Sequence, residues 1–218
     1  MIRSRLLAAP GVYRPGHDTA LLIRALDKEP VARRSTVLDL GTGSGALALA
    51  AARSGARVTA VDIAWRAVWT ARLNARLSGR PVRVRHCDLG SVHGLGPFDL
   101  AVSNPPYVPS PRPLPRRGAA QAWDGGPTGR SVVDRVCDTA ARVLRPGGAL
   151  LMVHSALCDE EASLDRLAGL GMKSAVIDRA FVPFGPVLRG RRNWLCAHGL
   201  LDRETTSEEL VVIRAELL

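Results

Sequence analysis

Residues 36–45 of this chain read TVLDLGTGSG, a short apolar run that ends in alternating glycines. Such a run is typical of a strand that is buried on both faces of a parallel sheet. The Ala- and Leu-rich residues 46–53 that follow predict a helix. Glycines between a strand and a helix let the backbone turn sharply and approach a ligand, to which the helix presents free N–H groups. We therefore expect an α/β fold with a ligand site at this first strand-to-helix turn.

Strand-like and helix-like segments alternate along the rest of the chain. We expect helices at 65–77, 131–144 and 160–168, strands at 57–62, 82–85, 98–103 and 149–154, and further strands near 174–177 and 210–213. Regular alternation of this kind predicts an open sheet with helices on both faces. The fold class is therefore α/β, a Rossmann-like open sheet of about seven mostly parallel strands.

The composition excludes several classes of protein. Hydrophobic residues make up 46% of the 218 residues and charged residues 23%, which is ordinary for a globular chain and excludes a disordered chain or a coiled coil. No run of 18 or more apolar residues predicts a membrane-spanning helix. The apolar patch at 6–9 is too short for a signal peptide, so we expect a cytoplasmic protein.

The charge and the cysteines say less about function. The net charge is +10, which favours encounter with anionic partners and leaves nucleic-acid contact open. Four cysteines are scattered without a Cys-x-x-Cys pair, so we expect reduced thiols and no metal site. Trp65 and Trp69 stand four residues apart in a predicted helix, which favours a packing pair.

The spacing of the glycine turn discriminates between two classes of ligand. Gly41, Gly43 and Gly45 form Gly-x-Gly-x-Gly with Asp39 two residues before it, whereas dinucleotide-binding enzymes carry Gly-x-Gly-x-x-Gly. An acid beside the turn would repel a pyrophosphate. Asp39 is instead expected to support the turn and to meet a cationic group of the ligand.

Acids also stand at the ends of the next two predicted strands. Asp62 can accept hydrogen bonds from both hydroxyls of a ribose, and Asp88-Leu89 can meet an adenine edge. Each acid alone could equally be a helix cap or a solvated strand end. Together with Asp39 and the glycine turn, they resemble the S-adenosylmethionine site of the Rossmann-like methyltransferases.

The tetrapeptide Asn104-Pro105-Pro106-Tyr107 follows the fourth predicted strand. A planar NH₂ group has a delocalised lone pair, so a site that methylates it must aim that lone pair at the methyl donor. The Asn104 side-chain oxygen and the Pro105 carbonyl can each accept one N–H, and the prolines stiffen the backbone that holds them. Tyr107 then offers a flat face for stacking. Such a transfer depends on positioning and requires no metal.

Residues 105–129 form a long connection with seven prolines, which argues against regular secondary structure there. It begins at a strand end, where open α/β sheets place their ligands, so we expect it to belong to the site.

These motifs carry a family resemblance. The chain resembles the HemK-type protein-glutamine methyltransferases, in their short eukaryotic- and archaeal-like branch. Residues 13–19 are similar to the family's Pro-x-x-Asp-Thr segment, and residues 122–130 to its Ala-Trp-x-Gly-Gly stretch. The resemblance implies S-adenosylmethionine as cofactor, contact of Thr19 and Asn104 with it, and N5-methylation of the Gly-Gly-Gln glutamine of a peptide-release factor.

The length of 218 residues predicts a single domain, and the resemblance implies how it is assisted. We expect one methyltransferase domain at 1–218, with an N-terminal segment and helix at 1–34 and a catalytic core at 35–218. Short relatives work with a small activating subunit, which this chain could share. The long form's helical N-terminal domain and the short branch's acid before Ala-Trp are both missing, and both bear on substrate choice. A planar amino group of a nucleic-acid base or a metabolite therefore remains an alternative substrate, and a non-catalytic cofactor-binding scaffold a further one.

Overall fold

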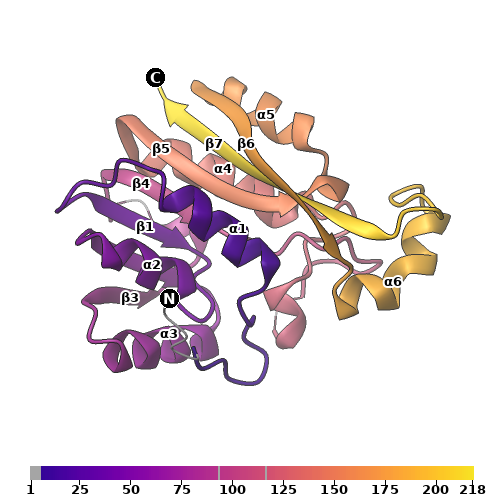
Figure 1. The fold of residues 1–218 in the computed structure, drawn as a ribbon, viewed down its shortest axis with the longest axis horizontal. Coiled ribbons are helices and arrows are strands. Elements are labelled where there is room, and N and C mark those ends of the chain that lie inside the picture. The colour runs from indigo at the N-terminus through magenta and orange to yellow at the C-terminus, as the bar shows by residue number, and fades with distance from the viewer. Residues whose placement is uncertain (1–5, 93, 116) are drawn as a thin grey trace.

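The fold is built around one seven-stranded sheet, seen in a computed structural model that describes residues 6–92, 94–115 and 117–218 (Figure 1). The strands are β1 (Thr36–Leu40), β2 (Arg57–Asp62), β3 (Val82–His86), β4 (Phe98–Ser103), β5 (Leu144–Ser155), β6 (Met172–Pro183) and β7 (Ser207–Leu217). Their order across the sheet is β3-β2-β1-β4-β5-β7-β6. Only β7 runs antiparallel to its neighbours within this sheet of described residues, so the predicted fold class is confirmed.

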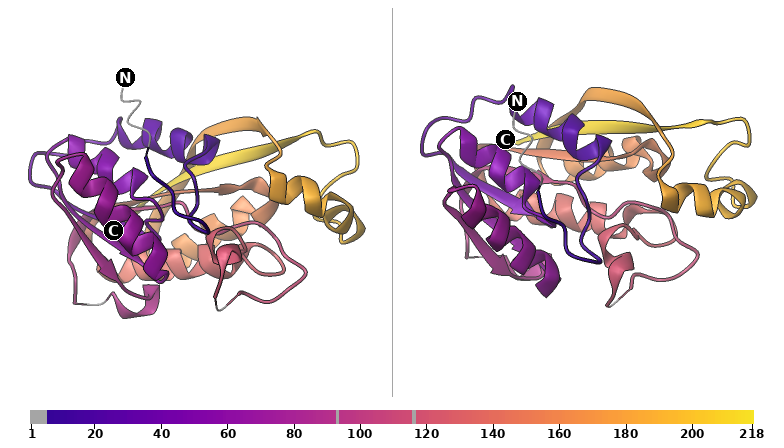
Figure 2. Two further views of the ribbon diagram at one scale, coloured as in Figure 1. Left: turned by 90° about the horizontal axis from the view of Figure 1, so that it is seen from below. Right: turned by 60° about the horizontal axis from the view of Figure 1, so that its bottom comes forward.

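Helices cover both faces of the sheet (Figure 2). They are α1 (His17–Leu26), α2 (Ala46–Arg53), α3 (Trp65–Leu77), α4 (Arg130–Val143), α5 (Glu160–Gly169) and α6 (Pro186–Ala197). The first three pack on one face, and α4 and α5 pack against each other and β4–β6 on the other. Because the chain crosses from one face to the other after β3, the carboxyl ends of β1 and β4 lie side by side with loops diverging on opposite sides, which opens a crevice there.

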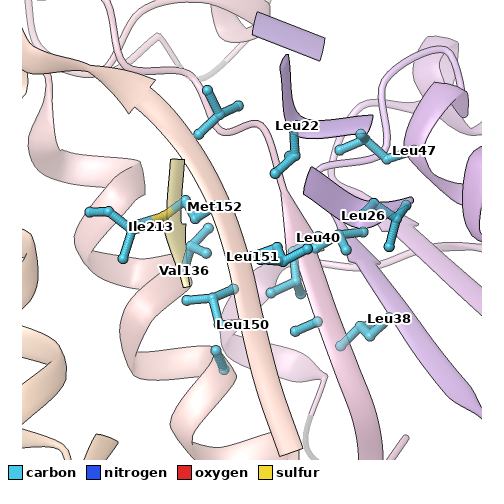
Figure 3. Close-up of a cluster of buried hydrophobic side chains, with 14 of the residues drawn as sticks. Leu22, Leu26, Leu38, Leu40, Leu47, Val136, Leu150, Leu151, Met152 and Ile213 are labelled. Atoms are coloured by element: carbon cyan, nitrogen blue, oxygen red, sulfur yellow. The ribbon is translucent and has the colours of Figure 1, made fainter. Parts of the chain in front are cut away.

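The core consists of aliphatic side chains on both sides of the central strands (Figure 3). Leu40, Leu151 and Met152 are fully buried. Leu22 of α1 lies on one side of these strands, and Val136 of α4 lies on the other (Figure 3). This packing joins α1 to the sheet, so the segment that precedes α1 is brought to the carboxyl ends of the strands.

The predicted elements agree with the structure except toward the carboxyl end. Strands β5, β6 and β7 are longer than expected, and α6 was not expected at all. Helix α6 buries only Leu188 and Leu195, has Gly190 in its middle and carries three arginines, so its apolar periodicity is weak. It lies beyond the end of the sheet, beside the proline-rich connection (Figure 1).

The tryptophan pair of α3 is not a packing pair. Trp65 stacks on His86 with 4.0 Å between ring centroids, and Trp69 is 64% exposed beneath the Arg72 guanidinium. The expectation was wrong because the 3.6-residue period alone does not say which face of a helix is buried.

The proline-rich connection, residues 105–129, is nearly free of regular structure, as predicted. Its described residues include one 3-10 turn, Ala119–Ala122, and an isolated bridge between Val108 and Asp124. Residues 6–16 run beside it, since a Cβ added at Gly11 would lie 3.4 Å from Ala119 (Figure 2). No helix in the described ranges has the length and apolar character needed to cross a bilayer.

Candidate active site

A cavity of about 360 Å³ lies at the carboxyl ends of β1, β2, β3 and β4. Its lining includes most of the residues that the sequence predicted to bind a cofactor: Thr19, Gly41, Gly43, Asp62, Asp88, Leu89 and Asn104. These residues come from five separate stretches of the chain, and the parallel sheet and the packing of α1 on it bring them together. Asp39 and Tyr107 are not among the lining residues of this cavity.

The glycine turn forms an open floor for the cavity. Gly41 and Gly43 have φ of 74° and 54°, in the region that favours glycine. A Cβ added at either would meet no atom within 4 Å, so the space above the backbone is free for a ligand. The Gly43 N–H donates to Asp62 Oδ2 at 2.9 Å, and the Ala64 N–H donates to Asp62 Oδ1 at 2.8 Å. Asp62 therefore holds the turn in place and lines the cavity at the same time.

Asp62 remains able to accept further hydrogen bonds. Each of its oxygens accepts one backbone N–H, and a carboxylate oxygen has more than one acceptor site. Burial raises the pKa of Asp62, although the N–H donors and the nearby His86 oppose that rise. A ligand hydroxyl pair would relieve this desolvation, which supports the predicted contact with a ribose.

Asp39 lies underneath the turn. It is fully buried, and its Oδ2 accepts from Thr42 Oγ1 at 2.6 Å and from the Ala48 N–H at 3.0 Å. No described residue donates to Oδ1. Burial raises the pKa of Asp39 to about 7, despite the two donors. Asp39 therefore supports the glycine turn, as expected. It does not line the cavity, which is lined instead by Thr42, the residue that donates to Asp39.

Asp88 is largely engaged with protein partners. Its Oδ1 accepts the Gly90 N–H at 2.8 Å, which caps the short turn Leu89–Ser91, and it pairs with the Arg135 guanidinium. Burial alone would raise the pKa of Asp88, but the Arg135 and Gly90 donors outweigh it and lower the pKa. Leu89 lines the cavity beside it, so the pair offers an acidic edge and an apolar surface together.

A second cavity, of about 470 Å³, adjoins the first. Asn104, Pro105 and Pro106 line both cavities. The second is further lined by residues of the N-terminal segment, the proline-rich connection, α6 and β7, among them Tyr13, Arg14, Asp18, Tyr107, Trp123, Val187 and Glu208. The Asn-Pro-Pro turn therefore stands where two binding spaces meet, which is the arrangement that a transfer between two molecules requires.

A chain of hydrogen bonds runs behind the Asn-Pro-Pro turn. Asn104 Nδ2 donates to Thr19 Oγ1 at 3.2 Å, and Thr19 Oγ1 donates to Asp18 Oδ1 at 3.2 Å. The phenol groups of Tyr107 and Tyr13 donate to Asp18 Oδ2 at 3.1 Å and 2.7 Å. Asp18 is 3% exposed and thus joins both predicted catalytic side chains to α1.

Tyr107 differs from its expected role in one respect. It lines the second cavity, where its ring is available as the predicted flat face, but it is 9% exposed and its hydroxyl is bound to Asp18. Burial, reinforced by the charge of Asp18, raises the pKa of Tyr107 well above its usual value, so it stays a neutral donor.

Three residues of this site were missed from the sequence. Tyr13 and Asp18 belong to the 13–19 segment that carried the resemblance, in which only Thr19 was assigned a role. Glu208 had no signal, because a single acid at the start of a strand is indistinguishable from a solvated one. Its placement depends on the antiparallel pairing of β7 with β5, which sequence periodicity does not encode.

Comparisons with known proteins agree with this geometry. The profile of the Methyltransferase small domain family matches residues 4–113. The chain is 32% identical over 182 residues to a putative protein N5-glutamine methyltransferase of Methanocaldococcus jannaschii, covering 83% of this chain and 90% of the relative. It is 39% identical over 159 residues to the release factor glutamine methyltransferase of Mycolicibacterium smegmatis, covering 68% of this chain and 56% of that relative. The chain thus spans about half the length of such bacterial relatives.

Solved structures share the fold. The E. cuniculi Mtq2-Trm112 complex, described as responsible for methylation of the eRF1 translation termination factor, matches with a TM-score of 0.67 and 23% identity over 95% of this chain and 99% of that one. The T. thermophilus 16S rRNA N2 G1207 methyltransferase, solved with AdoMet and guanosine, matches with a TM-score of 0.63 and 22% identity, covering 97% of this chain and 46% of that one.

Proposed function

The chain belongs to the methyltransferase small domain family and is an S-adenosylmethionine-dependent methyltransferase, and we propose that it methylates the side-chain amide nitrogen of a glutamine in a peptide-release factor. The observation that carries this proposal is the Asn-Pro-Pro turn between two cavities, with the Asn104 amide oriented from behind by Thr19. The relatives named for glutamine methylation supply the substrate class.

The first cavity fits the cofactor. S-adenosylmethionine, when bound, supplies a methyl group activated by its sulfonium sulfur. The glycine turn leaves room for the cofactor, because side chains at Gly41 and Gly43 would occupy the free space above the turn. Asp62 would hold the ribose, and Leu89 would meet the adenine. Asp39 lies below the turn and outside the cavity lining, so it would favour the cationic methionine end only through its charge and through the turn that it supports.

The second cavity suits an uncharged planar side chain. The Asn104 oxygen and the Pro105 carbonyl would each accept one N–H of the glutamine amide, and this grip turns the nitrogen lone pair toward the first cavity. Tyr107 would pack against the amide plane, and Pro106 and Trp123 complete an apolar wall that excludes water. The Asn-Pro-Pro turn thus provides orientation, and positioning of this kind contributes to the rate.

A partner and a cellular setting follow as part of this proposal. The E. cuniculi neighbour is described as a complex with Trm112, so a small activating subunit is a candidate partner for this chain. We place the protein in the cytoplasm, where release factors act. The net charge of +10 favours encounter with anionic partners, so contact with RNA is also part of this proposal.

Mass spectrometry tests the proposal. The chain is incubated with labelled S-adenosylmethionine and a folded release factor that carries Gly-Gly-Gln, with and without a candidate activating subunit, and in parallel with bulk tRNA and rRNA. One methyl group on the glutamine, absent from a Gln→Asn release factor whose shorter side chain cannot reach, is the expected result. Label in RNA alone would move the substrate to a nucleobase amino group.

A further inference from the structure

Glu208 is a buried acid that the binding and orienting roles above do not use. It lies at the start of β7, is 7% exposed, and lines the second cavity together with Asn104 and Pro105. No described residue donates a hydrogen bond to its Oε1. A buried carboxylate oxygen without a donor costs roughly 1–3 kcal/mol or more, so a retained one calls for an explanation.

The surroundings of Glu208 supply one hydroxyl donor, that of Ser155, and no countercharge that would explain the burial of this acid. The charge of Asp18 on α1 opposes that of Glu208, and the nearby thiol of Cys158 and phenol groups of Tyr13 and Tyr107 are neutral. Arg14 lines the same cavity. No ion pair between Glu208 and an arginine occurs in the described part of the chain.

The neighbouring acid Asp18 is in the opposite situation. Its two oxygens accept four hydrogen bonds, from Tyr13, Tyr107, and the N–H and hydroxyl of Thr19. Its acceptor sites are therefore occupied by the protein. Of the two acids that line the second cavity, Glu208 is the one with an oxygen left for a substrate or a proton.

The chemistry of amide methylation creates a need for such an oxygen. The glutamine nitrogen donates its electron pair to the methyl carbon, the bond between methyl and sulfur breaks, and the sulfur keeps that pair as a neutral thioether. The nitrogen then bears a methyl group, two protons and a positive charge, and one N–H must break with its electrons left on nitrogen. The amide oxygens of Asn104 and Pro105 accept hydrogen bonds but are far too weakly basic to keep a proton.

We propose that Glu208 is a further catalytic residue, the carboxylate that accepts this proton from the methylated glutamine nitrogen. The inference rests on the proposed function and deepens it. The carboxylate becomes a carboxylic acid and passes the proton to solvent after the product leaves, so charge and atoms balance. Burial raises the pKa of Glu208 to about 7, helped by the charge of Asp18 and opposed by the Ser155 hydroxyl, and a group of that pKa exchanges protons readily near neutral pH.

The test is the pH dependence of turnover with Glu208→Gln, which keeps the shape and removes the charge. In the wild type, kcat rises with pH through about 7 and then levels. In the variant we expect kcat to fall about 10²-fold on the plateau and the rising limb near 7 to disappear, with cofactor affinity within a few fold of wild type. Glu208→Asp keeps a carboxylate and should recover part of the rate.

The controls separate the catalytic role of Glu208 from an effect on folding and from a failure of the proposed function. Glu209→Gln changes the adjacent acid, which pairs with Arg179 on the surface, and should leave kcat unchanged. The melting temperature of Glu208→Gln reports whether the variant folds, and a value near that of the wild type makes its loss of kcat a catalytic effect. A wild type that leaves the release factor unmethylated contradicts the proposed function. An active wild type with the same kcat and pH profile in Glu208→Gln contradicts only the role of Glu208.

Discussion

Asn104, which follows β4, is held by Thr19, in the first turn of α1, through a hydrogen bond of 3.2 Å from Asn104 Nδ2 to Thr19 Oγ1. The single hydroxyl proton of Thr19 is directed to Asp18, so Thr19 Oγ1 can only accept from Asn104. The Asn104 amide is thereby oriented with its NH₂ toward α1 and its oxygen away from it. A residue 85 positions earlier in the chain thus sets the direction of the predicted catalytic acceptor.

Thr19→Val should slow turnover by loosening this orientation. Valine keeps the shape but neither accepts from Asn104 nor donates to Asp18, so a part of the asparagine population would point its NH₂ at the substrate. We expect kcat to fall about tenfold, a loss of about 1.4 kcal/mol that matches one hydrogen bond. Steady-state kinetics measure it, and Thr19→Ser should restore the rate. A loss of cofactor affinity with kcat intact would instead assign Thr19 to cofactor binding alone.

Asn104→Ala should abolish most turnover while leaving the cofactor bound. The side chain is expected to meet the substrate NH₂, so its loss acts on the transition state more than on cofactor binding. Removing one well-placed group from such a site commonly costs about 10²–10³ in rate. Calorimetry with S-adenosylmethionine and single-turnover kinetics separate the two effects. Asn193→Ala, an exposed asparagine of α6, is the matched control.

The sequence predicts the fold well where pattern and packing agree. Residues 36–40, 57–62 and 98–103 are apolar runs ended by Gly, Asp or Asn, and the structure has strands at these bounds. Helix α6 was not predicted because it buries only two leucines, and because Gly190 and the arginines beside them weaken the apolar period. Sequence patterns carry least information about contacts between segments that lie far apart along the chain.

The residues of the candidate site likewise divide into those that local sequence patterns predict and those that depend on long-range contacts. The acids Asp39, Asp62 and Asp88 could be predicted as site residues because each stands within two residues of a strand end, and the order of parallel strands brings such ends together. Glu208 and Asp18 could not, because their roles depend on which side chains they meet. Asp18 binds two tyrosines that lie 5 and 89 residues from it along the chain, and no spacing rule relates such positions.

Asp62→Ala should weaken cofactor binding by roughly 1.5–3 kcal/mol, the scale of hydrogen bonds to a charged group. The change removes the predicted ribose acceptor and also the anchor of the Gly43 and Ala64 N–H groups. Calorimetry with S-adenosylmethionine measures the loss. Asp27→Ala, at an exposed ion pair with Arg53, should leave the affinity unchanged. Equal affinity in both variants would remove Asp62 from the binding site.

Tyr107→Phe should be mild in activity and measurable in stability. The ring that we propose to pack on the substrate is kept, while Asp18 loses one of its four donors. We expect a loss of about 1 kcal/mol in the free energy of unfolding and less than a tenfold loss in kcat. Tyr107→Ala, which also removes the ring, should reduce kcat far more. Urea unfolding and kinetics check both, and similar kcat values for the two variants would show that the ring makes no contact that matters.

Asp39 should make the folded state less stable as the pH rises. Its pKa is about 7 when folded and 3.8 as a free side chain, so the folded state binds the proton more tightly. Stability then falls between about pH 4 and about pH 7 and is constant outside that window, by roughly 4 kcal/mol for a shift of this size. Glu208, raised to about 7 from 4.5, acts in the same direction. Asp88 and Asp99 have lowered pKa values and act in the opposite direction at lower pH.

The contribution of Asp39 can be isolated by comparing the wild type with Asp39→Asn across this window. Asparagine cannot ionise, so the difference in unfolding free energy between the two proteins should change by several kcal/mol from about pH 4 to about pH 8, in favour of the variant as the pH rises. The absolute stability of the variant is not the readout, because its NH₂ group takes the place of an oxygen that has no donor among the described residues. Urea unfolding at stepped pH measures the difference. Parallel curves for the two proteins would mean that Asp39 has the same pKa in the folded and unfolded chain, so the buried carboxylate would have to be solvated or paired in solution.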